Sequence, residues 1–159
     1  MPTDIFVKIG DVAGESSDGT HKDSIEVLSW SWGVSNPVSS TGTTGLSAGK
    51  ASLSEITYQQ MMDKSTPALQ LACATGKHYP TATLTARKSG GGQVDYLIVK
   101  MFEVFVSSLQ LGQGDGSVPS VSVSLAYNKM ELEYKIQKAD GSVSPGGTFK
   151  YSVAESKTY

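Results

Sequence analysis

The chain has 159 residues, with 13 Lys and Arg against 15 Asp and Glu, which leaves a net charge of −2 at pH 7. This length favours a single domain, which we expect to span residues 1–159. Proteins that bind nucleic acid need a basic face, and the longest basic run here is Arg87-Lys88. The charge pattern therefore disfavours nucleic acid as a partner.

The N-terminus, MPTDIFVKIG, lacks the charged and apolar regions of a secretory signal peptide. No apolar run approaches the ~20 residues that span a bilayer, so membrane insertion is not expected. Because Cys73 is the single cysteine, the fold cannot depend on an internal disulfide. We expect folding and assembly in the cytoplasm, with any export by a route other than the ordinary secretory signal.

The first elements are predicted to be strands joined by a turn-rich connection. Ile5, Val7 and Ile9 alternate with other residues and predict a strand over residues 3–9. Residues 10–22 are rich in turn signals, so their polar side chains, such as Asp18 and His21, are expected to be solvated. A strand over residues 25–35 follows and ends at Asn36-Pro37, because proline removes a ladder donor.

Trp30 and Trp32 are the only two tryptophans, and they lie two residues apart in this strand. Residues two apart share a face of a strand, so both indoles point to one side. Ser29 and Ser31 then point to the other side. The pattern predicts one packed face and one thin, uncharged polar face.

Residues 35–49 consist almost wholly of Ser, Thr and Gly and predict an extended flexible loop. A loop this long in a compact domain usually has a function or is disordered. We interpret it as a contact with another chain, with an unattached linker as the alternative. The candidate contact residues are Thr41, Thr43, Thr44, Leu46, Ser47 and Lys50.

One helix is expected near the middle of the chain, after a short strand whose alternation breaks near Glu55. Thr66 is a candidate N-cap, Pro67 suits the first helical position, and Gly76 suits a left-handed C-cap. The apolar stripe of this helix comprises Leu69, Ala72 and Cys73.

The remaining segments predict long strands. In residues 81–87 the inward set is Ala82, Leu84 and Ala86, and the outward set is Thr81, Thr83, Thr85 and Arg87. Residues 97–106 are apolar on both faces and must be covered on both sides. The apolar phase switches near Asn128-Lys129, which predicts a bulge or bend, and a last strand covers residues 148–153. The whole predicts seven to nine strands and one helix.

Motifs with catalytic meaning are weak. Residues 45–49 spell G-x-S-x-G around Ser47, but a nucleophile elbow needs a preceding strand and a following helix. Gly49-Lys50 misses two positions of a phosphate loop. His21 and His78 lack metal-ligand spacing with Cys73. We expect no catalytic, metal or cofactor site, and we keep a Ser47-dependent hydrolase as an enzyme alternative.

Four segments of the chain carry a family signature: DIFVKIGDVAGES (residues 4–16), DGTHKDSIEVLSWSWG (18–33), DKSTPALQLACATGKHYP (63–80) and QVDYLIVKMFEVFVSS (93–108). Together they resemble the haemolysin-coregulated protein (Hcp) family of the bacterial type VI secretion system. The resemblance covers nearly the whole chain in the expected order. It is weakest in the Ser/Thr/Gly loop, at residues 112–118 and after Asp140.

The resemblance implies a mainly β fold: a two-sheet antiparallel β-barrel flanked by one short α-helix, similar to phage tail-tube proteins. It also implies hexameric rings that stack into an inner tube and are exported. The implied partners are further copies of this chain, a contractile sheath, a spike trimer at the tip and effector proteins in the lumen.

Within that role, we expect Ser29 and Ser31 to face the lumen and contact effectors, because small hydroxyls offer weak, adaptable hydrogen bonds. Ordinary solvent exposure is the alternative for both serines. The alternative function is a monomeric β-barrel that binds a ligand, which would need an apolar interior cavity, whereas the inward residues suggest a filled one.

Overall fold

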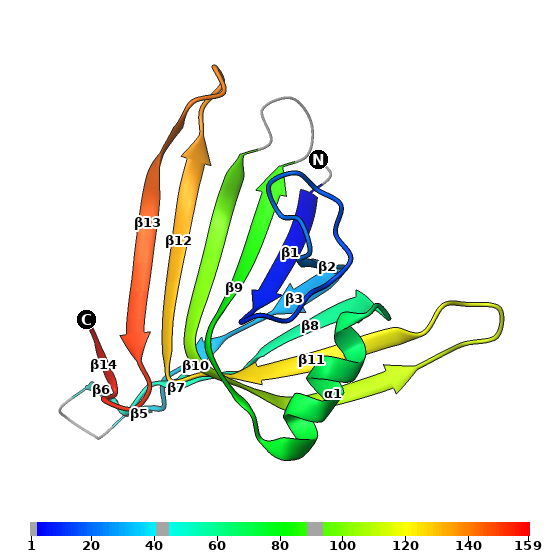
Figure 1. Cartoon of the computed structure of the whole chain (residues 1–159). Helices are drawn as coiled ribbons and strands as arrows, with labels where there is room; N and C mark the ends of the chain where they lie inside the picture. The colour runs from blue at the N-terminus through cyan, green and yellow to red at the C-terminus, as the bar shows by residue number, and fades with distance from the viewer. Residues whose placement is uncertain (1–2, 41–44, 89–93) are drawn as a thin grey trace.

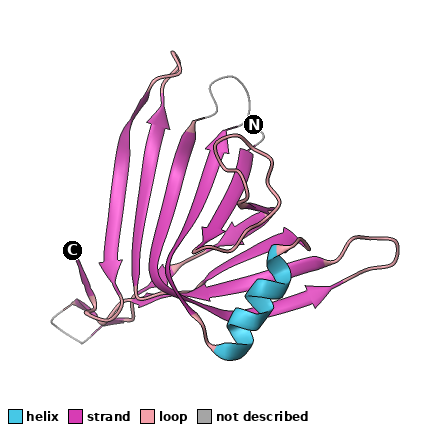
Figure 2. Ribbon diagram, in the orientation of Figure 1, coloured by secondary structure: helices cyan, strands magenta, loops and turns pink. Residues whose placement is uncertain are grey.

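The computed structural model describes residues 3–40, 45–88 and 94–159 and is built mainly of strands, with one helix in the described chain (Figures 1 and 2). The first strands are β1 (Thr3–Ile9), β2 (Ile25–Val27), β3 (Ser29–Ser31), β4 (Val34–Ser35), β5 (Val38–Ser40), β6 (Leu46–Ala48), β7 (Ser52–Leu53) and β8 (Ile56–Met61). They are followed by α1 (Ser65–Thr75), β9 (His78–Lys88), β10 (Asp95–Gly112), β11 (Ser120–Ala126), β12 (Lys129–Gln137), β13 (Val143–Ser152) and β14 (Lys157–Thr158).

The main sheet folds into two layers that share β10. The first part of β10 pairs with β9 and β12, and its last part, residues 105–112, pairs with β11. One layer thus contains β13, β12, β10, β9, β1 and β2, and the other contains β10, β11, β8 and β3 (Figure 1). All of these pairs are antiparallel. The predicted mainly β, two-sheet fold with one short helix is confirmed.

The segment predicted as one strand over residues 25–35 is divided into three. β2 pairs with β1 in the first layer, whereas β3 pairs with β8 in the second, and Leu28 lies between them. The inward phase changes at this break, since Val27 is buried and Trp30 is packed against the core. The chain crosses between the layers here, but β2 and β3 are not paired with each other. The strand pairing among the described residues therefore does not form a closed ring.

A filled core lies between the two layers. Leu84, Val99, Met101, Tyr58, Val123 and Leu125 are all fully buried, and α1 adds Leu69 and Ala72. The predicted inward set of residues 81–87 is confirmed. The predicted phase switch is also confirmed, because Leu125 and Met130 are both fully buried on either side of Asn128.

The start of the helix differs from the prediction that Thr66 is its N-cap. The helix begins at Ser65, and the Asp63 carboxylate accepts a hydrogen bond from the Ser65 backbone N–H at 2.9 Å. In return, the Asp63 N–H donates to Thr66 Oγ1 at 3.3 Å. The C-terminus agrees with the prediction, since Gly76 has a left-handed φ of 71° and its N–H donates to the Ala72 carbonyl.

β10 bends within its first half. Glu103 has a positive φ of 54°, and Met101 and Val104 are both buried on either side of it. The inward phase therefore shifts by one residue here, as at a bulge. We expected the opposite side of the strand to be fully covered as well, but Ile98, Phe102 and Phe105 on that side are only half-buried.

Part of the outer face of β1 and β9, around Phe6 and Arg87, packs against the connection after β1, so the expectation of solvated turn residues is wrong for Asp18 and His21. Arg87, expected on an open face, has 4% of its side chain exposed and donates to the Asp18 carboxylate at 2.9 and 2.6 Å. His21 stacks on the Phe6 ring, with 4.6 Å between centroids. Sequence spacing gave no sign of these contacts, which join residues far apart in the chain.

Candidate functional site

The outer face of β3, β8, β11 and the end of β10 carries only small hydroxyl and amide side chains along two rows. The strand register aligns Ser31, Thr57, Ser124 and Ser108 in one row and Ser29, Gln59, Ser122 and Gln110 in the next. We call these eight residues the uncharged polar face. No member carries a charge, so the face offers only neutral hydrogen bonds.

Hydrogen bonds between strands order this face. Thr57 Oγ1 and Ser124 Oγ are 3.0 Å apart, and Gln59 Nε2 donates to Ser122 Oγ at 3.1 Å. Ser29 and Ser31 are exposed at the β3 edge, in agreement with the predicted thin polar face. Sequence reasoning missed that three further strands extend this face. The Ser120, Ser122 and Ser124 alternation was the available signal.

The two tryptophans anchor the other side of β3. Trp30 and Trp32 are both partly buried against the core, as the two-residue spacing predicted. Trp32 Nε1 donates to the Tyr127 hydroxyl at 2.6 Å, and this hydroxyl donates to the Ser54 carbonyl at 2.7 Å. Burial raises the pKa of Tyr127 above its ordinary value. These bonds hold the exposed strand β3 in place from behind.

The expected flexible loop contains a two-stranded β-hairpin, which we define by the described strands β5 and β6 and call the hairpin. Val38 opposes Ala48, and Ser39 opposes Ser47, whose hydroxyl oxygens are 2.8 Å apart. Because the side-chain period of a strand is two, Leu46 shares the face of Val38 and Ala48. The hairpin thus has an apolar face and a serine face. Thr41, Thr43 and Thr44 lie outside the described residues.

The apolar face of the hairpin is open to solvent. Leu46 is 76% exposed and Val38 is 59% exposed. At the base, the Asn36 side chain exchanges two hydrogen bonds with the Gly49 backbone, at 2.9 and 2.8 Å. A Cβ at Gly49 would lie 2.7 Å from Pro37 Cγ, so the tight base requires glycine. Ser47 lies on a strand of this hairpin and not at a strand-to-helix turn, so it does not have the geometry of a nucleophile elbow.

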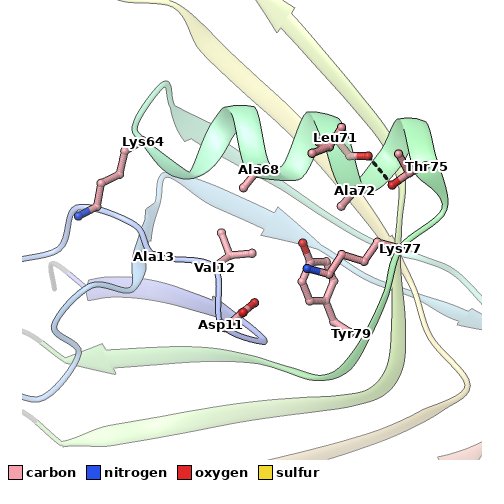
Figure 3. A pocket seen from close by; sticks show the side chains of 10 residues that line it. All are labelled: Asp11, Val12, Ala13, Lys64, Ala68, Leu71, Ala72, Thr75, Lys77 and Tyr79. Atoms are coloured by element: carbon pink, nitrogen blue, oxygen red, sulfur yellow. Dashed lines mark hydrogen bonds between the residues drawn. The ribbon is translucent and has the colours of Figure 1, made fainter.

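A separate groove of about 520 Å³ lies between α1 and the turn that follows β1 (Figure 3). Its walls include Val12, Leu71 and Tyr79, and Lys77 Nζ lies 5.0 Å from the centre of the Tyr79 ring. Burial and the nearby Asp11 raise the pKa of Tyr79. Half of the residues that line the groove are aliphatic, and no nucleophile is paired with a base among the lining residues.

Both histidines pack on aromatic rings: His21 on Phe6, and His78 on Phe105 at 3.8 Å between centroids. Across residues 3–40, 45–88 and 94–159, no three His, Cys, Asp or Glu side chains gather closely enough to hold a metal ion. In the same ranges, the helix is too short and too polar to cross a bilayer.

A family model described as type VI secretion system effector, Hcp, matches residues 6–134. The chain belongs to the Hcp family. It is 46% identical over 153 residues to the Hcp1 protein of Pseudomonas aeruginosa, covering 95% of this chain and 94% of that protein. Secretion and a role in the type VI tube fit this family.

Solved structures of Hcp proteins share the fold. A type six secretion system protein superposes with a TM-score of 0.94 at 33% identity, covering 99% of this chain and 100% of the other. Hcp1 from Salmonella typhimurium gives a TM-score of 0.78 at 28% identity over both full chains. The resemblance found in the sequence is therefore confirmed.

Proposed function

We propose that this protein is a structural subunit of the type VI inner tube. In this proposal, six copies form a ring, rings stack inside a contractile sheath below a spike trimer, and the protein is exported with effectors in its lumen. The subunit performs no catalytic step. The uncharged polar face is the observation that carries the proposal, because a conduit wall must contact cargo without holding it tightly.

Free sheet edges support the ring. Among the described residues, β3 pairs with β8 alone, and residues 108–112 of β10 pair with β11 alone. Each strand therefore presents an unpaired edge, and these edges lie on opposite sides of the same four-stranded layer. Unpaired edges invite pairing with another chain, and unlike edges make a head-to-tail contact that can close into a ring.

The chemistry of the polar face supports its place in the lumen, with Ser29 and Ser31 as effector-contact residues. Neutral hydroxyls and amides make hydrogen bonds worth about 1 kcal/mol each in net terms, and they bury little apolar area. A wall of this kind holds varied polypeptides weakly. The filled core disfavours the alternative, a monomeric barrel with a ligand in its interior.

The hairpin is proposed to contact an adjacent subunit through Leu46, Ser47 and Lys50, together with Thr41, Thr43 and Thr44. Its apolar face is uncovered within the described chain, and exposed apolar area of this kind commonly marks a contact surface. If the hairpin contacts another subunit, that contact should order it. Hydrogen exchange in residues 45–50 should therefore be slower in the assembled protein than in the monomer.

The first test is the solution mass of the purified protein, by light scattering after size exclusion, with negative-stain images of the peak. A species near six times 16.8 kDa with annular particles is expected. A clean monomer at high concentration contradicts the proposal and favours the ligand-binding module.

The second test places one larger side chain in the lumen. Ser31→Gln should leave the ring mass unchanged but reduce the co-purification of a co-expressed effector, because the longer amide side chain narrows the lumen. Thr148→Gln, at an exposed position on β13 outside the polar face, is the matched control. Equal retention by the two variants would argue against a lumen position for Ser31.

A further inference from the structure

We propose that Trp32 and Tyr127 are positioning residues for the part of the lumen wall that carries Ser31, so that the Tyr127 hydroxyl governs how well the ring retains an effector. The inference rests on the proposed tube function and adds two residues that lie behind the uncharged polar face. We use the name Ser31 row for the row of that face formed by Ser31, Thr57, Ser124 and Ser108.

The Ser31 row lies at the end of a strand ladder. β3 has three residues and, among the described strands, pairs with β8 alone. Its last registered pair is Ser31 with Thr57. The ends of a ladder open more readily than its middle, so the position of Ser31 depends on support from outside the ladder.

An irregular step follows this last pair. Ser31 opposes Thr57, and the next registered pair along the two segments is Val34 with Leu53. Two residues lie between these pairs on the β3 side, but three, residues 54–56, lie between them on the β8 side. One extra residue of this kind makes a β-bulge, which changes the direction of the side chains beside it. The direction of Ser31 therefore depends on what fixes the bulge.

Side chains fix the bulge where the ladder stops. The Gly33 N–H donates to Ser54 Oγ at 2.8 Å, and the Ser54 N–H donates to the Gly33 carbonyl at 2.9 Å. The Tyr127 hydroxyl accepts a hydrogen bond from Trp32 Nε1 at 2.6 Å and donates to the Ser54 carbonyl at 2.7 Å. One hydroxyl thus joins the two sides of the bulge, and neither side shifts without breaking one of its hydrogen bonds.

The two aromatic rings hold this hydroxyl in a fixed place. Tyr127 lies between β11 and β12, where the chain passes from one layer to the other. Trp32 packs against Phe149 of β13, with 5.8 Å between ring centroids. Both rings are partly buried against the core. Tyr127→Phe keeps the ring in this packing and removes only the hydroxyl, so it separates positioning from packing.

Hydrogen exchange and effector retention test the assignment in Tyr127→Phe. The ring mass by light scattering should equal that of the wild type. Exchange in residues 28–35 should become roughly five-fold faster, because one net hydrogen bond shifts an opening equilibrium by about that factor. Exchange in β9 should not change. The probe for retention is a co-expressed effector that co-purifies with the wild-type ring, and the variant should retain roughly two- to five-fold less of it.

Tyr159→Phe is the matched control. The Tyr159 hydroxyl donates to Glu131 on β12 at 2.7 Å, so the same substitution removes a similar bond away from the Ser31 row. It should leave exchange in residues 28–35 and effector retention unchanged. Trp32→Phe breaks the chain of hydrogen bonds from its other end. Trp32→Phe combined with Tyr127→Phe should lose no more retention than the weaker single variant, because both changes remove the same link.

The outcomes separate this inference from the proposed function. A wild type that forms no ring, or a wild-type ring that retains no effector, overturns the proposed function. If the wild-type ring retains the effector but Tyr127→Phe leaves retention or local exchange unchanged, only the positioning role is overturned. A Tyr127→Phe protein that loses the ring, or exchanges faster throughout the chain, shows a general role in stability and also overturns the positioning role. Additive losses in the double variant would do the same.

Discussion

The two layers of the fold carry similar polar patterns on their outer faces, but the protein uses them differently. The outer face of β1 and β9 includes Thr85 and Arg87, which are both buried, and Arg87 is paired with Asp18 of the connection after β1. The outer face of β3, β8 and β11 has serines, a threonine and a glutamine, and each of them is exposed or half-buried. One polar face is interior structure, and the other is surface.

The difference between the two faces shows how a charged group and neutral groups suit different surroundings. A buried guanidinium needs a fixed partner, because a buried charge without one is costly. Arg87 therefore clamps the connection onto the sheet through Asp18. A face intended to meet changing partners is better served by neutral groups, which lose little when a hydrogen bond is broken.

The largest expected effect comes from breaking the covered face. Asp18→Ala removes the main partner of Arg87 and should lower the Tm by roughly 10 °C, because it leaves a buried cation largely uncompensated. Asp115→Ala, in the exposed turn after β10, is the control and should leave the Tm unchanged in thermal unfolding. Equal Tm values for both variants would show that the clamp contributes nothing.

Acid should weaken the same clamp. The Arg87 guanidinium, together with the His21 backbone N–H, holds the pKa of Asp18 well below its usual range. A carboxyl whose pKa is lower in the folded state than in the unfolded state stabilises the fold when it is ionised. This stabilisation is complete above about pH 4, the ordinary aspartate pKa, and is lost as the pH falls towards the pKa of the folded state. The Tm difference between wild type and Asp18→Ala should therefore be smaller at pH 3 than at pH 7. A constant difference would contradict this assignment.

The smallest effect is expected on the open face. Ser122→Ala removes the acceptor of the Gln59 amide, but the exposed amide can donate to water instead. The free energy of unfolding should change by about 0.5 kcal/mol or less in a denaturant titration. A loss of several kcal/mol would mean that this face is covered like that of β9.

Much of the fold was predictable because alternation is a local property. The inward set of Ala82, Leu84 and Ala86, the phase switch at Asn128 and the Gly76 cap all depend on neighbours in sequence. The burial of Arg87 was not predictable in the same way, because Asp18 lies 69 residues away in the chain. The break at Leu28 was missed because Ile25 to Ser35 alternates well enough to suggest one strand.

The candidate site was predicted in part. Ser29 and Ser31 lie on the open face as expected. The strands that extend this face could not be predicted, because the sequence of one strand does not show which strands pair with it. The Ser/Thr/Gly loop was expected to lack structure because its composition is poor in apolar residues. The few apolar residues that it has, Val38, Leu46 and Ala48, lie on one face of the hairpin, so the hairpin is amphipathic.

The strand shared by the two layers has a consequence for how the subunit folds. β10 pairs with β9 near it in sequence, but also with β11 and β12, so both layers are completed on one strand. Loss of β10 from one layer must disrupt the other, which makes unfolding a single cooperative event. A chain released from synthesis is then either unfolded or folded in both layers, with no state in which one layer is formed and the other is not.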